Sequence, residues 1–175
     1  MNDDPRYPVG KFQKVTGADM DQRRAWIREI AAIPAQLAEA VRGLSEARLN
    51  EPYREGGWTL REVAHHLPDS HLNAYIRTKL ALTEDAPTIK PYDEAAWARL
   101  EDVSRTPVEV SVRLLHALHE RWATLLESLK EEDYARTFTH PEHGAQTLDW
   151  LVQLYAWHGR HHVAHITGTR AAKGW

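Results

Sequence analysis

The sequence contains no cysteine among its 175 residues. This absence excludes disulfide bonds, zinc sites with Cys ligands, iron–sulfur clusters and a Cys nucleophile. It fits a cytoplasmic protein, because disulfides are a feature of oxidising compartments. A thiol that takes part in a reaction here must therefore come from a cosubstrate.

Long apolar runs are absent as well. The longest stretch without Asp, Glu, Lys or Arg is residues 150–159, whereas a membrane-spanning helix needs about 20 apolar residues. The first residues, MNDDPRYPVG, lack the basic start and apolar run of a signal peptide. We therefore expect no membrane partner.

Neither sign of charge is in large excess, since the net charge is −3 and the pI is near 6.4. No basic stripe favours binding to nucleic acid, so we expect no nucleic-acid partner. Apolar residues make up 42% of the chain and charged residues 27%, which is typical of a folded globular protein. We predict a single domain over residues 1–175.

Four amphipathic stretches predict long helices. Their apolar residues recur at three- and four-residue spacings over residues 21–44, 59–83, 106–130 and 147–170. Thr59 with Glu62, and Thr106 with Glu109, have the spacing of helix-capping boxes. The pattern predicts an all-α fold, a four-helix bundle with long connecting loops and mostly antiparallel neighbours.

Two further features of the helices and links bear on the fold. Pro34 lies inside the first predicted helix and should kink it. The links contain no convincing strand pair, and Asp93 is placed to start a short helix. We expect helices two and four to be adjacent.

Eleven histidines are many for this length. In the fourth predicted helix, His158 and His162 are four residues apart and continue an apolar face, so their rings can converge on one ion. His161 and His165 have the same spacing, slightly to one side. From spacing alone both pairs remain open, and a core of hydrogen-bonded histidines is the alternative interpretation.

A third ligand is available on the second predicted helix. His66 lies nearly in line with the polar residues Ser70, Asn73 and Arg77. Three histidines from two helices would leave one coordination position open. Imidazole ligands suit zinc, nickel, copper or iron.

Other patterns are weaker. Glu62 and His65 form one Glu-x-x-His motif, whereas a di-iron bundle needs two. The His-Glu-x-x-His, Gly-x-Ser-x-Gly and Walker motifs are absent. Further residues are expected at the surface, in loops or, at best, in a pocket wall: Tyr53, Arg54, Trp58, Arg77, His116, His119, His140 and His143.

Longer motifs resemble a known family. They are YPVGKF from Tyr7, PYREGGWTLREVAHHLPDSHLNAYIRTKLALTED over residues 52–85, KPYDEAAW over 90–97, WHGRHHVAHI over 157–166, and the final Gly-Trp. Together they resemble the DinB/YfiT superfamily of metal-binding four-helix bundles, in its YfiT branch. The resemblance implies that His66, His158 and His162 bind a divalent metal, zinc or nickel. Pro68 departs from the branch's pattern, and we expect it to bend the helix that carries His66.

The resemblance also implies a metal-dependent enzyme. It would be a thiol S-transferase that uses a low-molecular-weight thiol such as bacillithiol, or a metal-dependent hydrolase. The expected partners are a small-molecule electrophile and such a thiol, and the oligomeric state is left open, with a homodimer as one alternative. A non-catalytic bundle with a structural metal is the other class. Asp69, one turn after His66, is the expected acceptor for a ligand's second ring nitrogen.

Overall fold

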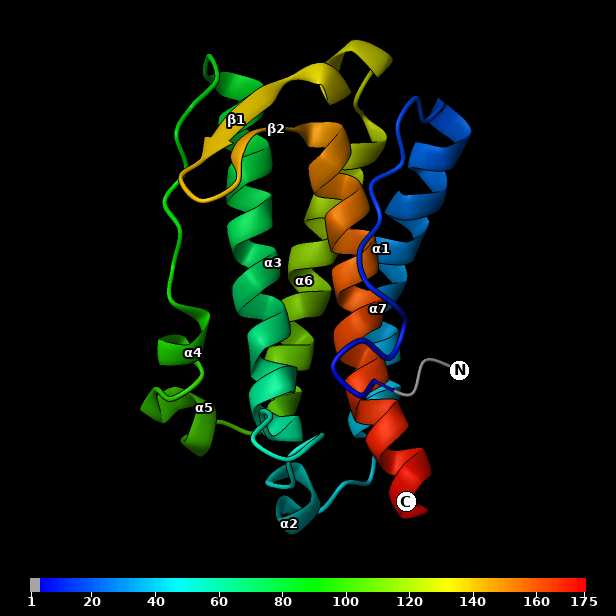
Figure 1. Cartoon of the computed structure of the whole chain (residues 1–175), viewed down its shortest axis with the longest axis vertical. Coiled ribbons are helices and arrows are strands. Elements are labelled where there is room, and N and C mark those ends of the chain that lie inside the picture. Colours follow the sequence, from blue (N-terminus) through cyan, green and yellow to red (C-terminus); the bar gives the residue numbers. More distant parts are fainter. Residues whose placement is uncertain (1–3) are drawn as a thin grey trace.

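The computed structural model describes residues 4–175 and is a four-helix bundle (Figure 1). The four long helices are α1 (Met20–Val41), α3 (Leu60–Thr83), α6 (Val108–Glu127) and α7 (Leu148–Lys173). Shorter elements lie in the links: α2 (Glu46–Leu49), α4 (Glu94–Trp97), α5 (Glu101–Arg105) and the 3₁₀ turn η1 (Glu131–Ala135). The predicted fold class and the four long helices are thus confirmed.

The four helices form a ring in which each contacts two others. α1 packs against α6 and α7, and α3 packs against the same two helices. Figure 1 shows α1 and α7 running in one direction and α3 and α6 in the other. Two neighbouring pairs are therefore parallel, and our prediction of mostly antiparallel neighbours is wrong. The cause is the link over residues 84–107, which runs along the bundle and returns the chain to the end where α3 began.

Capping chemistry explains where two of the helices begin. The Thr59 side chain accepts a hydrogen bond from the Glu62 backbone, and the Glu62 side chain accepts one from the Thr59 backbone. At α7, the Thr147 hydroxyl accepts from the backbone N–H of Trp150. The predicted box at Thr106 is wrong. Helix α6 begins at Val108 without a side-chain cap.

A small β-hairpin joins η1 to α7. Its strands, β1 (Thr137–His140) and β2 (Gly144–Thr147), are antiparallel, and His140 lies opposite Gly144. The prediction that the links hold no strand pair is therefore wrong. Four residues are too few to give a clear alternating pattern, and Gly144, at φ +69°, takes a backbone conformation that side chains disfavour.

A layer of histidines separates two apolar clusters of the core. On α3, one cluster ends at Leu67 and the other begins at Ala74; on α7, the division falls between Ala156 and Val163. His71 and the α7 histidines at positions 158, 161 and 162 lie in these gaps. Buried imidazole rings need hydrogen-bonding or metal partners. We therefore expect the functional site in this layer. None of the helices within residues 4–175 is both long and apolar enough to cross a membrane.

Candidate functional site

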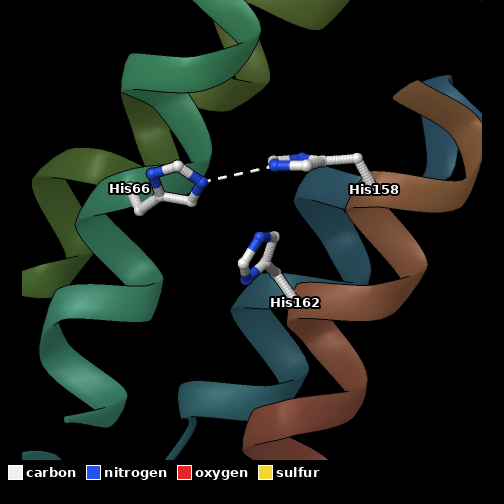
Figure 2. A group of neighbouring side chains, drawn as sticks. All are labelled: His66, His158 and His162. Carbon is white, nitrogen blue, oxygen red and sulfur yellow. Dashed lines mark hydrogen bonds between the residues drawn. The ribbon is translucent and has the colours of Figure 1, made fainter. Parts of the chain in front are cut away.

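The structure brings the three predicted ligands together. His66 comes from α3, and His158 and His162 lie on successive turns of α7. One ring nitrogen from each lies within 4.8 Å of the others. Figure 2 shows the rings of His66 and His158 facing each other, with His162 beneath the gap between them. The Nε2 atoms of His66 and His158 are 3.3 Å apart.

Helix packing fixes the position of the two α7 histidines. Gly159, between them, lies against Ile33 of α1, and a Cβ at this position would be 2.5 Å from Ile33 Cγ1. Only glycine permits this close approach without movement of the neighbouring chain. On the opposite helix, α3 continues through Pro68, and His66 still meets its partners. The expected bend at Pro68 does not keep the rings apart.

The three rings are electrically neutral at neutral pH. Burial lowers the pKa of His66 to about 4, and the nearby His161 adds to this effect. Burial, together with the neighbouring imidazoles, holds the pKa values of His158 and His162 well below the usual range. Neutral imidazoles can lie close together without mutual repulsion, and each offers a lone pair to an electrophilic ion.

A chain of hydrogen bonds leads from His158 into the core. His158 Nδ1 is 3.1 Å from His71 Nε2, His71 Nδ1 is 2.8 Å from His119 Nε2, and His119 Nδ1 is 2.6 Å from the Ile30 carbonyl oxygen. Burial lowers the pKa of His119 to about 4 and holds that of His71 far below its usual range.

Sequence reasoning missed this chain. His119 was expected at the surface, but it is only 1% exposed. The available signal was its spacing, because His119 lies four residues after Leu115 on the apolar face of α6, as His71 lies four residues after Leu67 on α3. His116, by contrast, is exposed as predicted.

The alternative pair on α7 also forms a group. Ring nitrogens of His161, His162 and His165 lie within 4.8 Å of one another. His165 stacks on Tyr53 with ring centroids 4.0 Å apart, and His161 stacks on Trp157 at 4.5 Å. Both pairs left open by the spacing are therefore grouped, and His162 belongs to both groups. A cavity of about 260 Å³ beside the second group is lined by Tyr53, Arg54, Gly56, Gly57, Trp58, His161, His162 and His165.

A larger cavity of about 810 Å³ reaches His158. Its walls come from α3, the link after α3, the hairpin and α7, and they include Ser70, Arg77, Tyr92, Glu94, His140 and Tyr155. His140 is buried rather than exposed, and its Nδ1 accepts a hydrogen bond from the Glu142 backbone N–H at 3.2 Å. The long links thus form the walls of a cavity beside the histidines.

Asp69 does not have the role expected from the sequence. Within residues 4–175 its carboxylate makes no hydrogen bond or ion pair with any of the three histidines. Burial, with Asp102 nearby, raises the pKa of Asp69 to about 6. The hydrogen-bond partner of His158 is His71 instead. The Nδ1 atom of His162 is buried and has no hydrogen-bond partner among residues 4–175.

Comparison with known proteins agrees with the motifs. The model of the DinB superfamily matches residues 29–166. A protein of Bacillus cereus (strain 03BB102), named "Putative metal-dependent hydrolase", is 51% identical over 175 residues and covers 100% of both chains. A protein of Bacillus mycoides (strain KBAB4) with the same description is 51% identical over 172 residues, which is 98% of this chain and 99% of that one.

A solved structure shows the same fold. YfiT from Bacillus subtilis, described as a probable metal-dependent hydrolase with an unusual four-helix bundle topology, is 43% identical. It aligns with a TM-score of 0.95 over 98% of each chain. The parallel neighbours in Figure 1 are consistent with an unusual topology. The family match and these relatives agree with the motifs, and the chain belongs to the DinB superfamily.

Proposed function

We propose that the protein is a metal-dependent enzyme in which His66, His158 and His162 hold one divalent ion, zinc or nickel. The observation that carries the proposal is the meeting of three neutral imidazoles from two helices beside an 810 Å³ cavity. The names of the relatives, which describe metal-dependent hydrolases, support the same general class.

The separation of the rings supports metal binding. Two imidazole nitrogens that each lie about 2.0–2.1 Å from a tetrahedral ion are about 3.4 Å apart. The Nε2 atoms of His66 and His158 are 3.3 Å apart. The His158 ring is also held from behind by His71, as is common for histidines that bind metals.

The protein's own residues would set up the reaction. Three neutral imidazoles would leave the positive charge of the ion uncompensated. The volume of the large cavity falls within the ~300–1,000 Å³ typical of small-molecule sites. When bound, a divalent ion supplies a Lewis acid that raises the acidity of a water or thiol at an open position. The cavity walls would orient the electrophile next to His158.

Within this class we infer that the nucleophile is an external low-molecular-weight thiol. The chain has no cysteine, so no internal thiol competes for the ion. In the transfer, the thiol loses its proton to solvent, its sulfur bonds to the electrophilic carbon, and the leaving group departs with the bonding electrons. In the alternative, hydrolysis, water adds to an acyl carbon and the leaving alcohol gains a proton.

A two-way comparison tests the proposal. Full-length protein loaded with Zn²⁺ or Ni²⁺ is assayed with a chloro-nitroarene plus cysteine, and separately with an activated ester in thiol-free buffer. We expect thiol-dependent chloride release that is lost on chelation and in His66→Ala, and kept in the exposed control His116→Ala. Ester turnover without thiol would favour hydrolysis. No turnover of either probe, with one ion bound, would contradict the enzyme and support a structural metal.

A further inference from the structure

The imidazole chain behind His158 has one fixed end. The last contact joins His119 Nδ1 to the carbonyl oxygen of Ile30 at 2.6 Å. A carbonyl oxygen can only accept a hydrogen bond, so His119 must carry a proton on Nδ1. In this hydrogen bond His119 Nδ1 is therefore the donor and the Ile30 carbonyl oxygen is the acceptor.

A proline makes this carbonyl available. In an α-helix, the carbonyl of Ile30 would accept from the backbone N–H of residue 34. Residue 34 is Pro34, which has no N–H. His119, from the neighbouring helix α6, supplies the missing donor. The proline inside α1 thus has a specific consequence, which is a buried acceptor facing the histidine layer.

The proton on His119 Nδ1 determines which nitrogen is protonated in all three rings of the imidazole chain. Neutral His119 with its proton on Nδ1 accepts at Nε2, so His71 must donate from Nδ1 across the 2.8 Å contact. His71 then accepts at Nε2, so His158 must donate from Nδ1 across the 3.1 Å contact. Three neutral rings carry three N–H protons, and all three lie in these contacts. None is left for Nε2 of His158.

We propose that His71 and His119 are positioning residues that keep the proton of His158 on Nδ1, so that its Nε2 presents a lone pair to the gap between His66 and His162 and, without metal, accepts the hydrogen bond from His66 Nε2. Where that lone pair binds the metal, the inference rests on the proposed function. The tautomer itself is a property of the metal-free chain.

The hydrogen-bonded imidazoles fix the tautomer of His158 and do not conduct protons to solvent. His71 is 0% exposed and His119 is 1% exposed, and the last acceptor is a backbone carbonyl, which does not release a proton. The contacts also join four helices, because His158 lies on α7, His71 on α3, His119 on α6, and the Ile30 carbonyl on α1. Ring orientation at His158 is therefore fixed by all four long helices of the bundle.

The inference is tested first without metal. Ring ¹⁵N–¹H correlation spectra of the metal-free full chain report which nitrogen of each histidine carries the proton. We expect the Nδ1–H form for His71, His119 and His158. In His119→Phe, His71 loses its acceptor, and we expect His158 to gain the Nε2–H form. A predominant Nε2–H form of His158 in the unmodified protein would overturn the proposal.

Metal affinity provides the second measurement. Titration with Ni²⁺ in competition with a chelator should show binding to His119→Phe weakened by about 10-fold or more, as for other outer partners of ligating histidines. His119→Gln keeps an acceptor for His71 and should recover most of the affinity, and the exposed control His116→Phe should match the unmodified protein. Unchanged spectra and affinity in His119→Phe would refute the inference.

The two proposals fail separately. If the unmodified protein binds no Ni²⁺ or Zn²⁺, the proposed function is wrong, while the spectra of the metal-free protein still decide the tautomer. If His119→Phe does not fold, the ring spectra of the unmodified protein decide the question, because they report directly which nitrogen of His158 carries the proton.

Discussion

Replacing Gly159 with alanine should separate close helix packing from helix propensity. In an ordinary helix interior, Gly→Ala is stabilising by about 1 kcal/mol. At Gly159, however, the new Cβ would lie 2.5 Å from Ile33 Cγ1 and 2.6 Å from Ile33 Cδ1. Normal carbon–carbon contacts are about 3.5–4.0 Å, so Ile33 or the α1–α7 contact must move by about 1 Å.

The control variant lies on the same helix. Gly168 is exposed, and a Cβ there would meet nothing within 4 Å. Overpacking of a core contact costs about 1–3 kcal/mol. We therefore expect Gly159→Ala to be less stable than Gly168→Ala by about 1–3 kcal/mol. For a chain of this size, each 1 kcal/mol corresponds to about 2–4 °C in Tm.

Urea unfolding of the two variants measures this difference. Gly168→Ala should unfold at a higher urea concentration than the unmodified protein, and Gly159→Ala at a lower one than Gly168→Ala. Adding Ile33→Ala to Gly159→Ala should relieve the clash, so the two substitutions should not be additive. Equal stability of the two alanine variants would refute the close approach of α7 to α1.

Three further predictions concern a buried ion pair, the effect of pH on stability, and metal binding. Arg23 Nε lies 2.8 Å from Asp149 Oδ1 in a mostly buried ion pair. Asp149→Ala leaves Arg23 without that partner and should lower the free energy of unfolding by about 3 kcal/mol. The control Asp21→Ala removes an exposed ion pair and should change the free energy of unfolding by less than about 0.5 kcal/mol. Since burial lowers the pKa of His119 to about 4, the unfolded chain binds more protons between pH 6.5 and 4, and this ring should remove about 1.4 kcal/mol of stability per pH unit as the pH falls. Urea unfolding of the metal-free protein at pH 7, 6 and 5 should show this slope reduced in His119→Gln, and an identical slope in both proteins would contradict it. Chelation followed by thermal unfolding should lower the Tm of the metal-loaded protein, because an ion that binds only the folded state stabilises it, and an unchanged Tm would count against metal binding.

Local patterns predicted the elements well. Three- and four-residue apolar spacing located all four long helices, and the Thr59 box marked the start of α3 because its chemistry lies within one helical turn. The grouping of His158 with His162 also depends on one turn of helix. These features were accessible because the interacting residues are close in sequence.

Features that depend on distant contacts were missed. The parallel arrangement of α3 and α6 depends on the path of residues 84–107, which run back along the bundle. The composition of this link does not indicate which way it runs. The contact between His119 and the Ile30 carbonyl spans 89 residues, so neither residue alone indicates it. Pro34 was expected to kink α1, whereas its consequence at the site depends on which helix lies beside it.

Spacing also could not choose between two histidine pairs on α7. The structure groups His161 and His165 with His162 as closely as it groups His66 and His158 with His162. The choice rests on the family motif and on the hydrogen-bonded support of His158. A measurement of which histidines hold the ion is therefore the central test.

Metal content of single-histidine variants tests the account most directly. Protein reconstituted with Zn²⁺ or Ni²⁺, freed of excess ion and analysed for metal, should contain one ion per chain. His66→Ala and His158→Ala should lose that ion, while His161→Ala and His165→Ala, whose rings belong to the other group, should retain it. Loss of the ion in His161→Ala and His165→Ala, with retention in His66→Ala, would contradict the proposed site.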